Sequence, residues 1–158
     1  MKFLKKKILK KIVIVLAVIF VGIQFVPTKR NQSTEVLDTD FITLFNAPDN
    51  IKTMLKTSCY DCHSNNTIYP WYNKIQPISY FLEGHIDEAK EELNFSKFGS
   101  YSKRKQKSKF KSLAKQVKKK EMPLPSYTLI HRDASLSDDQ ILEFTDWVYQ
   151  LEPNTTKR

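Results

Sequence analysis

The stretch SCYDCH, residues 58–63, is the feature around which the rest of the chain is organised. It places Cys59, Cys62 and His63 in the pattern C-x-x-C-H, the sequence signature of covalent c-type haem attachment. Two thiols at this spacing can each add to one vinyl group of a porphyrin, and the histidine that follows is then placed under the iron as its proximal axial ligand. The chain contains only these two cysteines. The motif therefore predicts one covalently bound haem c.

Three other interpretations compete with haem attachment. A structural zinc site requires four ligands, whereas His85 and His131 stand alone and far apart in the sequence. A thioredoxin-like redox pair is found near a βαβ pattern, which this sequence lacks around Cys59. A structural disulfide would suit an oxidising compartment but gives His63 no role. Haem attachment is the interpretation that uses the whole motif.

The composition indicates a helical protein whose positive charge is local. The chain has 158 residues, only three glycines, and apolar residues that recur at helical spacing. Its net charge is +9, but residues 1–30 contain eight of the 26 basic and none of the 17 acidic residues, so the remainder holds 18 basic against 17 acidic residues. This distribution argues against a nucleic-acid-binding function. We predict an all-α, cytochrome c-like helical domain around one haem.

The N-terminal region is predicted to lead the chain to and through a membrane. A lysine-rich start is followed by an apolar run, residues 12–26, and the segment counted from residue 8 to residue 26 reaches the lower limit of a membrane-spanning length. No small-residue cleavage site follows this run, so residues 1–27 are interpreted as an uncleaved signal anchor, a transmembrane helix in the inner membrane. The alternative is a cleaved signal that leaves a soluble periplasmic protein. Under either interpretation the rest of the chain faces the periplasm, where bacteria attach c-type haem.

The remaining chain is divided by its pattern of polar and apolar residues. Residues 28–40 are polar and predict a tether, and residues 154–158 form a short tail. The segment between them, residues 41–153, is predicted to be the haem-binding domain.

Two residues are candidates for the sixth coordination position of the iron. Met122 lies in the segment Met122–Pro125, whose two prolines prevent a helix, and His/Met ligation is common in cytochromes c. The alternative is a methionine that fills a gap in the core. His85 lies in a predicted helix that starts near Pro77, and it is either a hydrogen-bonded core histidine or the alternative distal ligand.

Two further helices have clear sequence signals. Residues 103–120 are rich in lysine, yet Phe110, Leu113, Ala114 and Val117 keep the spacing of an amphipathic helix. The basic face is either simply solvated or a docking surface for an acidic redox partner or anionic lipid. In the last helix, Ser137 and Gln140 form a predicted capping box.

The order of these features resembles class I cytochrome c, and the finer match is to a small haem-binding domain family of exported bacterial proteins. The stretches that carry the resemblance are SCYDCHSNNTIYPWY, IQPISYFLEGHIDEAKEELNFSKF and MPLPSYTLIHRDASLS, within residues 35–152. The resemblance implies one c-type haem bound through Cys59, Cys62 and His63. Met122 matches the family's Met-Pro element, and His85 matches a histidine of its central helix.

The sequence thus predicts a membrane-anchored monohaem c-type cytochrome that transfers single electrons and is not an enzyme. The alternative is a haem-based sensor or a peroxidase-like enzyme with an open sixth coordination position. That alternative would apply if neither Met122 nor His85 bound the iron.

Overall fold

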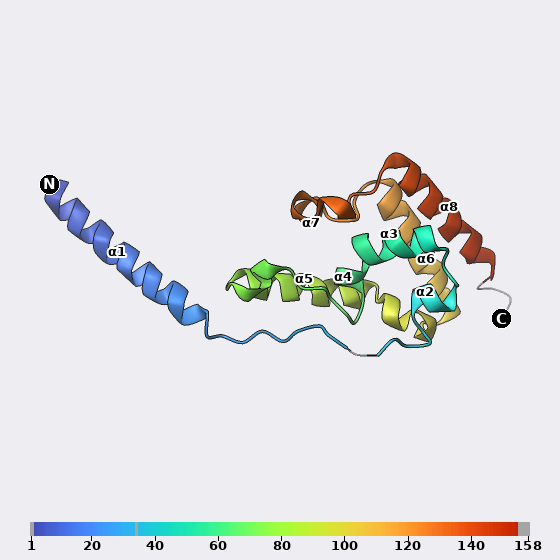
Figure 1. Ribbon diagram of the computed structural model, residues 1–158, viewed down its shortest axis with the longest axis horizontal. Coiled ribbons are helices and arrows are strands. Elements are labelled where there is room, and N and C mark those ends of the chain that lie inside the picture. Colours follow the sequence, from blue (N-terminus) through green and yellow to red (C-terminus); the bar gives the residue numbers. More distant parts are fainter. Residues whose placement is uncertain (1, 34, 155–158) are drawn as a thin grey trace. The chain divides into compact units, whose positions relative to one another are not determined.

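The computed structural model describes residues 2–33 and 35–154, and the regular elements in these ranges are all helices (Figure 1). The all-α prediction is therefore confirmed. The predicted tail lies outside the described residues except for Asn154. In chain order the elements are α1 (Lys2–Ile23), α2 (Phe41–Leu44), α3 (Asp49–Ser58), α4 (Tyr60–His63), η1 (Trp71–Lys74), α5 (Ile78–Glu92), η2 (Phe95–Ser100), α6 (Lys103–Lys118), α7 (Pro125–Ile130), η3 (Arg132–Ala134) and α8 (Asp138–Asn154), where η denotes a 3₁₀ helix.

The prediction of an N-terminal transmembrane helix is not supported by the structure. Helix α1 covers most of the predicted segment, residues 8–26. However, in the described part of the chain no helix has both the length and the apolar character needed to cross a membrane. Lys10 and Lys11 lie near the middle of α1. The part of α1 that follows them, residues 12–23, spans only about 18 Å, against a hydrocarbon core of about 30 Å.

The chain folds as two compact units. The first contains residues 1–30 and 69–85, and the second contains residues 31–68 and 86–158, so the division falls within α5. In the first unit, Gln24 joins the end of α1 to the segment before α5. The Gln76 backbone N–H donates to Gln24 Oε1 at 3.0 Å, and Gln24 Nε2 donates to the Gln76 carbonyl at 3.1 Å. These two hydrogen bonds hold the residues that follow α1 beside Gln76.

The core of the second unit is built around a cluster of aromatic rings. Phe41, the first residue of α2, is completely buried. Its ring centroid lies 4.8 to 6.0 Å from those of five other aromatic residues, at angles that favour edge contacts. These five are Phe45, Phe95, Phe98, Phe110 and Trp147. The cluster therefore connects α2, η2, α6 and α8.

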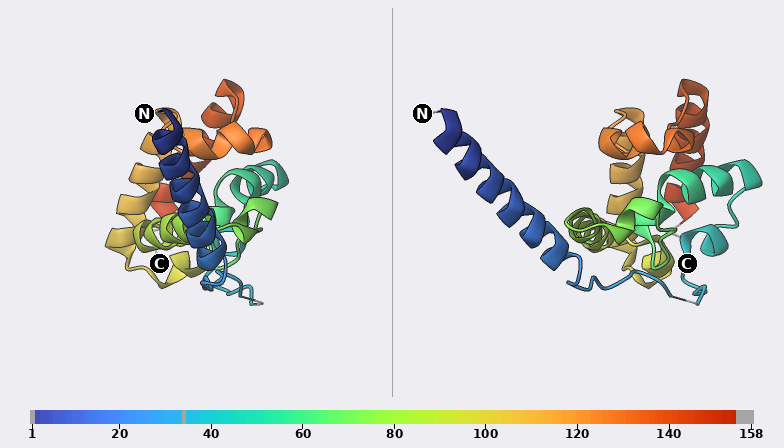
Figure 2. Two further views of the ribbon diagram at one scale, coloured as in Figure 1. Left: turned by 90° about the vertical axis from the view of Figure 1, so that its left-hand side faces the viewer. Right: turned by 60° about the vertical axis from the view of Figure 1, so that its left-hand side comes forward.

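Helices α6 and α8 pack against each other and complete this core (Figure 2). The predicted apolar stripe of α6 is buried, as are Phe144, Val148 and Leu151 of α8. The capping box is also confirmed, because the Gln140 N–H donates to Ser137 Oγ at 3.2 Å and the Ser137 N–H donates to Gln140 Oε1 at 2.9 Å.

The loop after α4 is held by residues 31–33, which belong to the segment predicted as a tether. Gln32 and Asn66 form an isolated antiparallel bridge. Asn31 Nδ2 donates to the Ser64 carbonyl at 2.8 Å, and the Thr67 N–H donates to the Asn31 carbonyl at 3.0 Å. This pairing positions the chain immediately after the C-x-x-C-H motif.

Candidate functional site

Helix α4 places the three residues of the C-x-x-C-H motif on a single helical turn. Helix α3 leads into it, and the Cys59 N–H continues the helical hydrogen bonding by donating to the Leu55 carbonyl at 3.0 Å. The N–H groups of Cys62 and His63 both donate to the Cys59 carbonyl, at 3.2 and 2.9 Å. Residues separated by three and four positions share one helix face. Both thiols are free rather than joined in a disulfide.

The ring of His63 is oriented by two backbone carbonyl groups. Its Nδ1 lies 2.9 Å from the carbonyl oxygen of Ala89 and 2.9 Å from that of Leu93, at the C-terminal end of α5. A carbonyl oxygen can only accept a hydrogen bond, so Nδ1 carries the hydrogen. In the neutral ring Nε2 then keeps its lone pair, which is the arrangement usual for a metal-ligating histidine. His63 is therefore prepared to bind a metal through Nε2.

Burial shifts the pKa values of the motif's side chains. It lowers the pKa of His63, which favours the neutral ring at neutral pH. Burial, with a smaller effect from Cys62, raises the pKa of Cys59 to about 12. Burial and then the charge of Asp61 raise the pKa of Cys62 to about 11. At neutral pH the folded chain therefore presents two thiols and a neutral imidazole.

Tyr60, the first residue between the cysteines, connects α4 to the aromatic core. Its ring stacks on Phe95, with centroids 5.2 Å apart and planes 4° from parallel. Its hydroxyl donates to Asp40 Oδ1 at 3.0 Å, and the same oxygen accepts the Ile42 N–H at the start of α2. Burial and then the Asp40 charge raise the pKa of Tyr60, so it remains protonated and acts as the donor.

Asp61, the second residue between the cysteines, is bound by two other segments. Its Oδ1 accepts the Ile68 N–H at 3.0 Å, and its backbone carbonyl accepts the Thr67 hydroxyl at 2.6 Å. Its Oδ2 accepts the hydroxyl of Tyr127, in α7, at 2.8 Å. The motif is thus connected to the segment that follows Met122.

The two candidates for the sixth ligand lie in different units. Met122 is half-buried in the second unit and lines a small open pocket of about 130 Å³ between the end of α6 and the start of α8, together with Pro123 and Leu136. His85 is exposed on α5 and belongs to the first unit. Met122 is thus in the same compact unit as His63.

The match to a known family supports what this geometry indicates. A model of the haem-binding domain matches residues 18–150. The chain belongs to the haem-binding domain family. Haem is therefore the cofactor that the family assigns to this domain. Neither a curated protein nor a solved structure matches the chain.

The residues present fit a haem. The haem-binding domain offers two free thiols and a histidine whose Nε2 keeps its lone pair, all on one turn. A zinc site would require a different arrangement, and within residues 2–33 and 35–154 there is no group of three or more His, Cys, Asp or Glu side chains that could hold a metal ion. The donor set suits an iron that a porphyrin already binds.

Sequence reasoning identified the motif but not the residues that hold it. Ala89 and Leu93 act through backbone carbonyls, which no residue type reveals. Tyr60 and Asp61 occupy the two positions that the motif leaves unspecified. Tyr127 lies 66 residues from Asp61. A partly buried tyrosine usually finds a hydrogen-bond partner for its hydroxyl, but the sequence contains no signal for which carboxylate Tyr127 reaches.

Proposed function

We propose that the protein is a monohaem c-type cytochrome that carries single electrons. The observation that supports this most strongly is the pair of 2.9 Å contacts from His63 Nδ1 to the Ala89 and Leu93 carbonyls. They hold the ring in the tautomer that an iron ligand requires, directly after two free thiols. When bound, the haem supplies an iron that exchanges one electron.

The residues of this site have distinct roles in the proposal. Cys59 and Cys62 would hold the haem through two thioether bonds, and His63 would bind its iron as the proximal ligand. Met122 would be the sixth ligand, with His85 as the alternative. Ligation by Met122 would close the iron to substrates and favour electron transfer over peroxidase-like or sensor functions. The protein then needs no catalytic acid or base, because electron transfer moves no proton at these residues.

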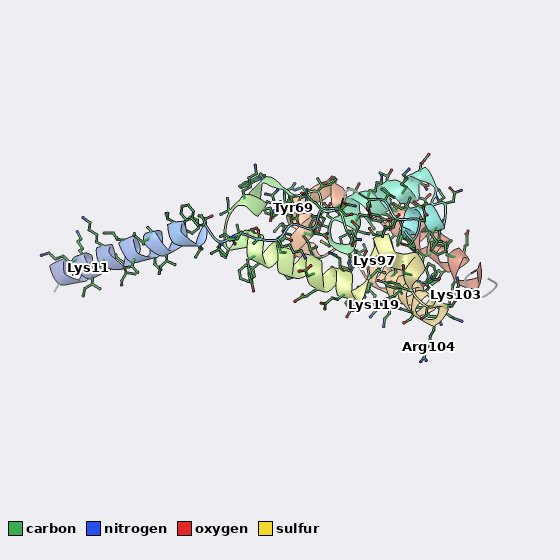
Figure 3. All side chains as sticks on the ribbon, turned by 90° about the horizontal axis from the view of Figure 1, so that it is seen from below. Lys11, Tyr69, Lys97, Lys103, Arg104 and Lys119 are labelled. Carbon is green, nitrogen blue, oxygen red and sulfur yellow. The ribbon has the colours of Figure 1, made fainter. Side chains whose placement is uncertain are left out.

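We also propose that the haem domain works on the periplasmic side and exchanges electrons with acidic proteins. The lysine-rich start of the chain and the largely apolar segment of residues 8–26 support export and contact with the inner membrane. The basic face of α6 supports an acidic partner. Lys103 and Arg104 are exposed at its start, where the Arg104 side chain extends away from the ribbon (Figure 3).

A haem stain on a denaturing gel tests covalent attachment. The full chain would be produced with the c-type maturation machinery, beside a Cys59→Ala, Cys62→Ala double variant. We expect a stained band at the position of the wild-type protein and none for the double variant. An unstained wild-type protein that is nevertheless folded and exported would contradict the proposed cytochrome function.

The absorption spectrum of two further variants identifies the sixth ligand. We expect Met122→Ala to lose the low-spin spectrum that a methionine ligand of the iron produces, and His85→Ala to keep it. A low-spin iron that survives Met122→Ala but is lost in His85→Ala would assign the position to His85. A wild-type spectrum without a sixth protein ligand would favour the sensor or peroxidase-like function.

A further inference from the structure

The hydrogen bond between Tyr127 and Asp61 joins two segments that the proposed ligation uses together. Asp61 lies in α4 between the two haem-attachment cysteines, and Tyr127 lies in α7, which begins three residues after Met122. The hydroxyl of Tyr127 donates to Asp61 Oδ2 at 2.8 Å. A hydrogen bond to a charged acceptor at this distance belongs to the strong class.

Asp61 is also held by the loop that follows His63. The Ile68 N–H donates to Oδ1 at 3.0 Å, and the Thr67 hydroxyl donates to the Asp61 backbone carbonyl at 2.6 Å. Both donors come from the loop that follows His63. They occupy Oδ1 and the backbone of Asp61 and leave Oδ2 for the tyrosine.

Tyr127 is also held in place by contacts within and next to α7. Its ring stacks on that of His131, with centroids 4.4 Å apart and planes 16° from parallel. Its N–H donates to the Leu124 carbonyl and its carbonyl accepts the His131 N–H, both at 2.9 Å. The hydrogen bond therefore forms between two groups that lose little further freedom when they meet.

The Met122 segment has few backbone anchors of its own. Pro123 and Pro125 lack an N–H group and cannot donate a hydrogen bond. On the N-terminal side, the Met122 N–H reaches the Gln116 carbonyl at 3.4 Å, a long contact, and the Glu121 N–H reaches it at 2.9 Å. On the C-terminal side, the segment continues directly into α7 and its Tyr127–Asp61 contact.

We propose that Tyr127 is a positioning residue that keeps Met122 on the haem iron by holding α7 to Asp61 in the haem-attachment motif. This inference rests on the proposed function, in which Met122 is the sixth ligand. Without the hydrogen bond, the Met122 segment would move away from the iron more often. The open state would then be more populated, with no change to either axial ligand itself.

Imidazole binding to the oxidised protein measures this population, because imidazole takes the sixth position only when the protein ligand has left it. The apparent affinity rises in proportion to the fraction of open protein. The variant Tyr127→Phe removes the hydroxyl and keeps the ring on His131. We expect it to bind imidazole about ten- to a hundredfold more tightly, the factor that corresponds to losing one hydrogen bond to a charged group. The absorption band that arises from the bond between the Met122 sulfur and the iron should weaken in the same variant.

Two reference variants make the result specific. Tyr149→Phe makes the same chemical change on an exposed residue of α8 and should bind imidazole like the wild type. Met122→Ala should bind it at least as tightly as Tyr127→Phe. If Met122→Ala binds tightly while Tyr127→Phe matches the wild type, the positioning role is wrong and the ligand assignment stands. If Met122→Ala also matches the wild type, the ligand assignment fails and this inference fails with it.

A variant of the acceptor, Asp61→Ala, tests the same Tyr127–Asp61 hydrogen bond. Asp61→Ala removes the acceptor and leaves Cys59, Cys62 and His63 in place, and the haem stain reports whether it is loaded. If the two residues act through one hydrogen bond, the double variant should bind imidazole no more tightly than the stronger single variant. Independent, multiplying effects would contradict the proposal. If one of the variants Tyr127→Phe and Asp61→Ala is not produced as stable protein, imidazole binding to the other is sufficient for the test.

Discussion

Tyr60 is a residue of the attachment motif whose hydroxyl also stabilises the core. Its partner Asp40 is 7% exposed, and one carboxylate oxygen of Asp40 accepts both the Tyr60 hydroxyl and the Ile42 N–H. The substitution Tyr60→Phe removes this hydroxyl, so the buried Asp40 carboxylate has one hydrogen-bond donor fewer. We expect a loss of about 1.5–3 kcal/mol in the free energy of unfolding, measured by chemical denaturation.

The control for this prediction is Tyr149→Phe, which changes a residue that is 48% exposed. Surface substitutions of this kind usually change the free energy of unfolding by less than about 0.5 kcal/mol. If Tyr60→Phe were no more destabilising than Tyr149→Phe, the contact with Asp40 would have no net stabilising effect. The ring of Tyr60 would then contribute only through its stacking on Phe95.

At the scale of the element, two glycines are expected to respond in opposite ways to the same substitution. Gly84 lies inside α5, and a Cβ atom there would meet nothing within 4 Å. Gly99 lies in the last turn of η2, beside the chain before α2, and a Cβ atom there would lie 3.0 Å from Thr39 Cα. We expect Gly84→Ala to raise the free energy of unfolding by about 1 kcal/mol and Gly99→Ala to lower it.

Each glycine variant is the other's control, since both add a single methyl group. Thermal unfolding of the haem-loaded protein gives the sign of each change, and the haem stain shows whether loading is affected. A Gly84→Ala variant that folds but loads less haem would show that the space beside Gly84 is needed by the cofactor. A stabilising Gly99→Ala would contradict the close approach to Thr39.

The helices differ in how far the sequence could predict them. The apolar stripe of α6 and the capping box of α8 are local patterns of three or four residues, so they could be predicted and are found. The motif Cys59–His63 was found for the same reason. The contacts from Tyr60 to Asp40 and from Tyr127 to Asp61 link distant segments, and only the fold brings them together. The predicted transmembrane helix, for which apolar residues were counted across Lys10 and Lys11, is not supported by the described part of the chain.

At the scale of the whole molecule, the distribution of charge would govern encounters with the acidic partners proposed above. Several lysines of α6 already pair with acidic groups: Lys109 lies 3.3 Å from Glu92, and Lys111 lies 3.6 Å from Glu152. Lys103 and Arg104 are exposed at the N-terminal end of the helix. Under the proposed function they are therefore candidates for attracting an acidic partner through long-range electrostatics.

We expect the variant Lys103→Glu, Arg104→Glu to slow electron transfer to an acidic redox protein about tenfold at low salt. The difference should shrink as salt is added, because salt screens exposed charges. Stopped-flow mixing over a range of ionic strength measures both effects. The control, Lys29→Glu with Lys74→Glu, makes the same change in net charge at exposed residues of the first unit. Equal slowing in both variants would show that net charge matters and that the α6 face does not.

The residues between the two cysteines, Tyr60 and Asp61, also limit how freely this haem-attachment sequence could be transplanted. A motif search writes both positions as x and treats them as interchangeable. Here the Tyr60 hydroxyl donates to Asp40, at the start of α2, and Asp61 accepts the hydroxyl of Tyr127 in α7. A graft that kept both thiols and His63 but replaced the two intervening residues with alanine would retain every atom that bonds to the cofactor. It would lose the hydrogen bonds to Asp40 and Tyr127, among other contacts of these two side chains. In redesigning this protein the motif is therefore better treated as a six-residue module, residues 58–63, than as three reactive side chains.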